Sequence, residues 1–97
     1  MSDDDDLTTL RIRVEGFVQA VGYRNYAIEQ ATRIGLDGWI RNRSDGTVEI
    51  LISGATKPVE EFVGLCMKGP PGSRVANVEL HKAEPPEEKG FKRRPSV

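Results

Sequence analysis

The sequence has one cysteine, one histidine and no long apolar run, and each scarcity argues against a class of protein. A single cysteine cannot form a disulfide framework, so the composition is typical of a reducing compartment. His81 has no cysteine or second histidine near it, whereas a metal site needs three or four ligands, so we expect no metal centre. Without an 18-residue apolar stretch or a signal-peptide pattern, we expect a cytoplasmic protein that makes no membrane contact.

An excess of charge of either sign is also missing. Lysine and arginine number 14 against 15 aspartates and glutamates, giving a net charge of −1. No bulk field would therefore recruit nucleic acid or an anionic membrane. The length of 97 residues fits one domain with a single core. We expect residues 1–7 to form a disordered acidic N-terminal tip and residues 8–97 to form that domain.

Hydrophobic periodicity predicts the order of the elements. Residues that alternate between apolar and polar predict strands, and apolar residues at helical spacing predict helices. The predicted strands are 10–14, 36–42, 47–53, 75–80 and a short 91–94, and the predicted helices are 25–34 and one that Thr56 caps and Gly69 ends. Gly54 is expected to break the third strand, and Cys66 falls on the apolar stripe of the second helix as core filler.

This order, β-α-β-β-α-β with a short fifth strand appended, predicts an α+β fold of the ferredoxin-like split βαβ type. Both helices should pack on one face of an antiparallel sheet. RNA-recognition modules share the order, so the fold alone does not decide the function. Those modules stack bases on aromatic residues of the first and third strands. Here neither strand carries an aromatic residue, so we expect no nucleic-acid partner.

The segment Glu15–Arg24 joins the first strand to the first helix and is bounded by Gly16 and Gly22. Such a loop presents unpaired backbone N–H groups at the positive end of a helix, which suits an anion. Arg24 adds a planar fork that matches phosphate oxygens. A Walker-type loop is excluded by the glycine spacing and the missing lysine. On these residues alone, a tight turn with a surface arginine stays the simpler interpretation.

Longer motifs resemble the acylphosphatase family, in order and from about Leu10 to Pro95. The segments that carry the resemblance are Val18–Arg24, Gly35–Asn42, Asp45–Glu49, Gly69–Val75 and Gly90–Pro95. Two positions depart from the usual pattern, which has glycine where this chain has Ala20 and commonly phenylalanine where it has Tyr23. We expect a negative φ at Ala20, because Gly16 and Gly22 can supply the difficult backbone angles.

The resemblance implies hydrolysis of small acyl phosphates to carboxylate and inorganic phosphate by in-line attack of a positioned water. It assigns phosphate binding to Arg24 and to the backbone N–H groups of Val18, Gln19, Ala20, Val21 and Gly22. It assigns orientation of the water to Asn42, a position that without the family would be interpreted as turn-forming.

We therefore expect a metal-independent enzyme without cofactor, a monomer, with inorganic phosphate as product and competitive inhibitor. The alternative is a non-catalytic anion-binding or regulatory module of the same fold.

Overall fold

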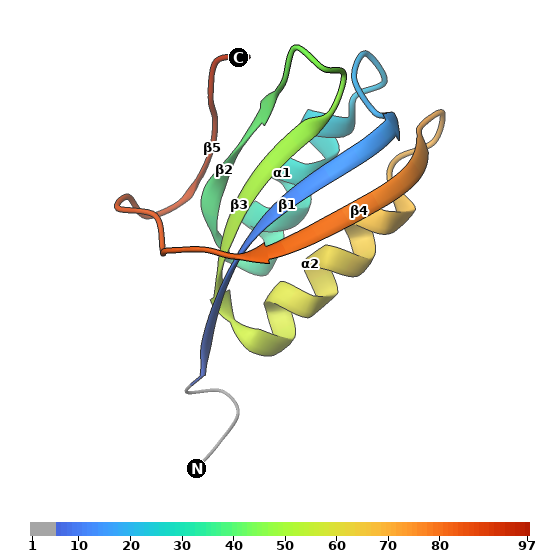
Figure 1. The fold of residues 1–97 in the computed structure, drawn as a ribbon. Coiled ribbons are helices and arrows are strands. Elements are labelled where there is room, and N and C mark those ends of the chain that lie inside the picture. The colour runs from blue at the N-terminus through green and yellow to red at the C-terminus, as the bar shows by residue number, and fades with distance from the viewer. Residues whose placement is uncertain (1–5) are drawn as a thin grey trace.

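The computed structural model describes residues 6–97, in which two helices cover one face of a five-stranded sheet (Figure 1). The predicted order of elements is confirmed. The elements are β1 (Leu7–Phe17), α1 (Tyr23–Ile34), β2 (Asp37–Asn42), β3 (Val48–Ala55), α2 (Thr56–Lys68), β4 (Arg74–Lys82) and β5 (Phe91–Arg93). Residues 1–5 of the predicted acidic tip lie outside the described residues, and Leu7 already belongs to β1.

The strands lie in the order β4-β1-β3-β2-β5, so β1 and β3 are central. Four strands pair antiparallel, but β5 runs parallel to β2, with Gly38 opposite Phe91. The predicted fold class is confirmed, and the sheet is mixed because the appended fifth strand runs parallel to its neighbour. The reason is the connection after β4, which crosses one end of the sheet and reaches the far edge where β2 begins (Figure 1). A chain that enters at that end can only run in the direction of β2.

Two predicted details around the start of α2 were wrong. Gly54 does not break β3, because it pairs with Thr8 and the strand continues to Ala55. A Cβ atom at Gly54 would collide with the side chain of Leu36, so the glycine makes room for packing. Thr56 does not cap α2 either. Its hydroxyl instead lies 2.7 Å from that of Thr8, which ties the helix to β1.

The core lies between the sheet and the helices. The register aligns Ile12 of β1 and Ile40 of β2 with Ile50 of β3, and all three are fully buried. Cys66 is 1% exposed, as its position on the apolar stripe of α2 predicted. Burial raises the pKa of its thiol to about 12, so the nucleophilic thiolate is scarce at neutral pH. Among residues 6–97, no helix combines the length and apolar character needed to cross a bilayer.

Candidate active site

The loop of residues 18–22 leaves the sheet at a β-bulge. The pairing of β1 with β4 shifts register between Glu15 and Gly16. Gly16 has φ 128°, and a Cβ atom there would overlap the backbone of Arg74 and Ala76. Glycine is therefore required for this close approach. After the bulge, Val18 is 1% exposed and anchors the start of the loop in the core.

The side chain of Gln19 holds the loop against the β2–β3 hairpin. Its amide nitrogen donates hydrogen bonds of 2.9 Å to the carbonyl oxygens of Arg43 and Thr47. These two residues flank the hairpin turn, where the backbone N–H of Arg43 also donates to the carbonyl of Thr47. These two hydrogen bonds tie the loop to the hairpin at the end of β2. Sequence reasoning assigned only the backbone of Gln19 and missed this clamp.

The first turn of α1 is left open for an anion. Gly22 is the N-cap, with φ 77°, and no side chain of residues 6–97 caps the helix. The first helical hydrogen bond is made by the N–H of Tyr26, so the N–H groups of residues 23–25 have no partner four residues earlier. The first turn also contains no acidic residue that would offset the positive end of the dipole.

Ala20 adopts φ 50°, and it is the only non-glycine residue with positive φ in residues 6–97. The expectation of a negative φ was therefore wrong. Gly16 and Gly22 do have positive φ, but they are occupied by the bulge and the helix cap. The turn between them needs a left-handed residue of its own. Turns of this kind direct successive backbone N–H groups to one concave side, where anions bind.

The loop and the start of α1 surround a hollow of about 190 Å³. It brings together most of the predicted phosphate-binding residues and adds three that were not predicted to bind phosphate: Tyr23, Asn25 and Arg93. The lining residues are Val18, Gln19, Ala20, Gly22, Tyr23, Arg24, Asn25 and Arg93. Val21, which was predicted from its backbone N–H, does not line the hollow.

Arg24 is free to meet an incoming anion. It is the second residue of α1, after Tyr23, and its side chain is half-buried at the hollow. Within residues 6–97 it forms no ion pair with a carboxylate. An arginine at the positive end of a helix is unfavourable unless an anion joins it.

Asn42 is the last residue of β2 and pairs with Val48. It lies on the helix-covered face with Ile40 and is followed directly by Arg43, whose carbonyl holds Gln19. Its side-chain oxygen is buried, and no donor within residues 6–97 reaches it. Such an atom costs about 1–3 kcal/mol of stability when it is left unpaired. Asn42 does not line the hollow itself; it lies at the same end of the sheet, beside the clamped hairpin.

Arg93 ends β5 beside β2, at the hollow, and the chain after it continues along β2. The backbone N–H of Arg94 donates to the carbonyl of Ile40 at 2.8 Å, and that of Val97 donates to the carbonyl of Asn42 at 3.0 Å. Held in this way, Arg93 extends over the start of α1 and donates a hydrogen bond to the side-chain oxygen of Asn25. No sequence signal placed Arg93 here, because its neighbour in the sheet was unknown.

Tyr23, the second departure from the usual acylphosphatase pattern, has a structural role. Its ring is 1% exposed, and its hydroxyl donates to the carbonyl of Cys66 at 2.7 Å. Tyr26 donates in the same way to the carbonyl of Leu65 at 2.9 Å. Both carbonyls belong to the last turns of α2, so two tyrosines of α1 satisfy the end of the other helix. Burial raises the pKa of Tyr23, which keeps it a neutral donor.

Comparison with known proteins places this arrangement in a family. The family model for acylphosphatase matches residues 10–93. An acylphosphatase of Rhizorhabdus wittichii is 41% identical over 96 residues, which is 99% of this chain and 97% of that protein.

Solved structures agree with this assignment. The acylphosphatase of Bacillus subtilis has a TM-score of 0.83 and 35% identity, covering 90% of this chain and 97% of its own. That of Coxiella burnetii has a TM-score of 0.87 and 27% identity, covering 97% and 100%. These matches share the fold and extend over nearly the whole chain, and the chain belongs to the acylphosphatase family.

Proposed function

We propose that this protein hydrolyses the carboxyl–phosphate bond of small acyl phosphates, and that the hollow at the start of α1 holds the phosphoryl group. An acyl phosphate is an activated anhydride with a good carboxylate leaving group. Its hydrolysis needs a positive cradle for the phosphoryl oxygens and a water placed in line with the leaving group. The observation that carries the proposal is Arg24, unpaired within residues 6–97, beside an uncapped helix N-terminus in a member of this family.

Two kinds of donor bind the phosphoryl group in this proposal. The guanidinium of Arg24 contributes a charged, planar fork. The backbone N–H groups of residues 18–22 contribute neutral donors, and Val21, although it does not line the hollow, is proposed to act through its backbone alone. These donors are fixed before substrate binds, because Gln19 and Val18 hold the loop in place. Preorganised donors of this kind stabilise the charge that develops in the transition state.

Asn42 is proposed to orient the attacking water. Its buried side-chain oxygen accepts a hydrogen bond from that water, which supplies the partner that residues 6–97 do not. The water oxygen then forms a bond to phosphorus while the bond from phosphorus to the acyl oxygen breaks. The electron pair of that bond leaves on the carboxylate, and the proton of the water passes to the phosphate or to solvent. The products are carboxylate and inorganic phosphate, and phosphate competes with substrate for the same donors.

The finer properties are proposed together with the activity: a metal-independent reaction in a cytoplasmic monomer without a nucleic-acid or membrane partner. Within residues 6–97, no three histidine, cysteine, aspartate or glutamate side chains group in a way that suits a metal ion. Arg24 and the loop N–H groups supply the positive charge that a metal provides in other phosphoryl-transfer enzymes.

The test is steady-state hydrolysis of benzoyl phosphate with and without a strong chelator, with inorganic phosphate as inhibitor. We expect turnover that the chelator leaves unchanged, and competitive inhibition by phosphate. Loss of most activity in chelator, restored by magnesium or zinc, would overturn metal independence. Phosphate binding without turnover of any acyl phosphate would favour the non-catalytic module instead.

A further inference from the structure

A second arginine, Arg93, lines the same hollow as Arg24 but comes from the other end of the chain. It belongs to β5, where it lies opposite Ile40 of β2 and therefore on the helix-covered face of the sheet. Its side chain reaches the first turn of α1 and donates to the side-chain oxygen of Asn25. Like Arg24, it forms no ion pair with a carboxylate within residues 6–97.

The contact with Asn25 orients both side chains toward an anion. A guanidinium can only donate, so the amide of Asn25 must turn its oxygen to Arg93 and keep its two N–H donors for another acceptor. Arg93 uses one of its five N–H groups in this bond, which leaves the remainder of the fork available. The hollow thus has side-chain donors from Arg24, Asn25 and Arg93, and in the described part of the chain no acidic residue lines it.

The charge of the ligand matches two arginines better than one. A phosphate monoester carries roughly −1.5 to −2 charges at pH 7. Arg24 alone offsets one of these charges, and the partial charge of the helix N-terminus adds about half a unit. A second cation lining the same 190 Å³ hollow brings the site close to neutrality when it is occupied. Without an anion, two arginines face one hollow beside a positive helix end.

We propose that Arg93 is a second phosphate-binding arginine, which donates to the phosphoryl group together with Arg24. The proposal rests on the hollow being the phosphoryl site proposed above. It assigns Arg93 to the phosphoryl group, not to the acyl group. Replacing Arg93 therefore weakens the binding of inorganic phosphate and of every acyl phosphate to the same extent.

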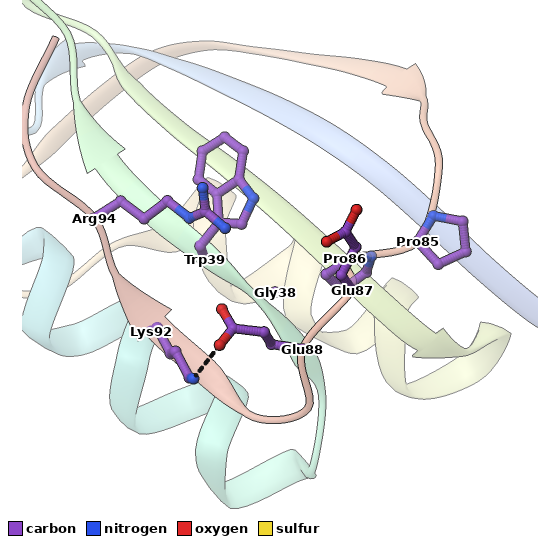
Figure 2. Close-up of a pocket in the computed structure, with 8 residues that line it drawn as sticks. All are labelled: Gly38, Trp39, Pro85, Pro86, Glu87, Glu88, Lys92 and Arg94. Carbon is purple, nitrogen blue, oxygen red and sulfur yellow. Dashed lines mark hydrogen bonds and ion pairs between the residues drawn. The ribbon is translucent and has the colours of Figure 1, made fainter.

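The neighbouring Lys92 provides a matched control. Alternate residues of a strand point to opposite faces, so Lys92 and Arg93 project to different sides of the sheet. Figure 2 shows Lys92 beside Glu88 in a separate pocket that also contains Trp39 and Arg94. Its ammonium donates to the carboxylate of Glu88 at 3.1 Å. Lys92→Gln removes the same unit of charge at almost the same place in the chain but does not touch the hollow.

The experiment measures binding of inorganic phosphate by calorimetry and its inhibition constant, for the parent, Arg93→Gln, Arg93→Lys and Lys92→Gln. We expect Arg93→Gln to lower the affinity for inorganic phosphate about five- to tenfold, as for loss of a charge-assisted hydrogen bond at an exposed site. The phosphate affinity of Arg93→Lys should lie between that of Arg93→Gln and that of the parent, because lysine keeps the charge but lacks the planar fork. The phosphate affinity of Lys92→Gln should stay within about twofold of the parent value, since exposed charges outside the site are screened.

The substrate comparison uses benzoyl phosphate and monosuccinyl phosphate, whose acyl group carries a second charge. Equal losses of kcat/KM for both in Arg93→Gln support phosphoryl binding. Unchanged phosphate affinity, with or without a loss confined to monosuccinyl phosphate, would overturn the proposal. Direct binding of phosphate needs no turnover. If the parent protein does not hydrolyse acyl phosphates, the proposed activity is wrong, but the binding experiment still tests the role of Arg93.

Discussion

Two groups of arginines in this protein lie on opposite sides of the same sheet and have opposite surroundings. On the face away from the helices, the arginines are paired with carboxylates of the protein itself. Glu49 accepts hydrogen bonds from Arg41 at 2.7 Å and from Arg43 at 2.9 Å, and Arg13 lies 3.2 Å from both Asp45 and Glu79. At the hollow, Arg24 and Arg93 have no such partner within residues 6–97.

The difference shows which arginines are available to a ligand. Hydrogen bonds from Thr47, followed by that from Arg13, lower the pKa of Asp45 to about 2. Burial acts to raise the pKa of Glu49, but the bonds from Arg41 and Arg43 outweigh it and the pKa is lowered. These carboxylates therefore stay ionised at neutral pH and neutralise their arginines. Among residues 6–97, no carboxylate lines the hollow, so in the proposed mechanism the neutralising charge comes from the substrate.

Replacing Arg24 should break this contrast most strongly. Arg24→Gln removes the fork that the proposed mechanism places on the phosphoryl group, so we expect kcat/KM to fall by about a thousandfold or more. Competitive inhibition by phosphate should disappear with it. The control is Arg13→Gln on the opposite face, where carboxylates of the protein already neutralise the arginine. Its kcat/KM should stay within about twofold of the parent value. Equal losses in the two variants would mean that pairing does not distinguish functional from structural arginines.

Asn42 tests whether the water is held separately from the phosphate. Asn42→Ala removes the buried oxygen but leaves Arg24 and the loop donors in place. We expect kcat to fall roughly 100- to 1,000-fold, as for loss of one positioned polar group, while the phosphate inhibition constant changes little. Stability should not fall, since the deleted oxygen has no partner in residues 6–97. A variant that lost phosphate binding and kept kcat would reverse the assigned roles.

Glu49 sharpens the other half of the comparison. Glu49→Gln removes the charge that holds Arg41 and Arg43, so we expect a loss of about 1–3 kcal/mol in unfolding free energy. Activity should stay near that of the parent, because the cluster lies on the face away from the hollow. Denaturant unfolding measures the loss, and Glu61→Gln, which disturbs only an exposed pair with Arg33, is the control, expected to lose under about 1 kcal/mol.

The same variant has a pH signature. The pKa of Glu49 in the folded state lies below its ordinary value of 4.5. Its contribution to stability is therefore complete above about pH 4.5 and is lost as the pH falls through the folded-state value. Glu49→Gln has no proton to gain there. The difference in unfolding free energy between parent and variant should narrow as the pH falls below about 4.5, and a constant difference would contradict the assignment.

Much of the fold was readable from the sequence because it depends on local patterns. Alternation at Ile12 and Val14 and helical spacing at Val59 and Phe62 placed these side chains in the core, where they are fully buried. The direction of β5 was not readable, since it depends on where the crossing after β4 leads. The same gap hid Arg93, which reaches the hollow only because β5 lies beside β2.

The candidate site was predictable only in part. The glycines and Arg24 suggested an anion site by their chemistry, but Asn42 needed the family motif, because its neighbours in space are distant in sequence. The clamp of Gln19 joins residues 24 and 28 positions apart and leaves no periodic signal. Ala20 was misjudged for a related reason. Its angle depends on the route that the chain takes between the bulge at Gly16 and the cap at Gly22.

Ala20 therefore offers the finest test, because its replacement should change the hollow only slightly. A left-handed angle at an alanine costs on the order of 1 kcal/mol, and glycine relieves that cost. Glycine also raises the entropy of the unfolded chain, which offsets about 0.4–1 kcal/mol. We expect Ala20→Gly to raise Tm by about 1–4 °C and to raise the affinity for inorganic phosphate by about threefold or less.

The control for Ala20→Gly is Ala76→Gly in β4, an exposed alanine beside the bulge whose φ is negative, so that glycine relieves no left-handed strain there and brings an entropic penalty. Tm should fall in that variant while it rises in Ala20→Gly, and calorimetry on both measures the opposite signs. A fall of equal size in the two variants would show that the left-handed angle of Ala20 carries no strain. In that case the loop would be as relaxed with alanine as with the glycine usual in the family. Alanine at position 20 would then leave the N–H donors that face the hollow unchanged.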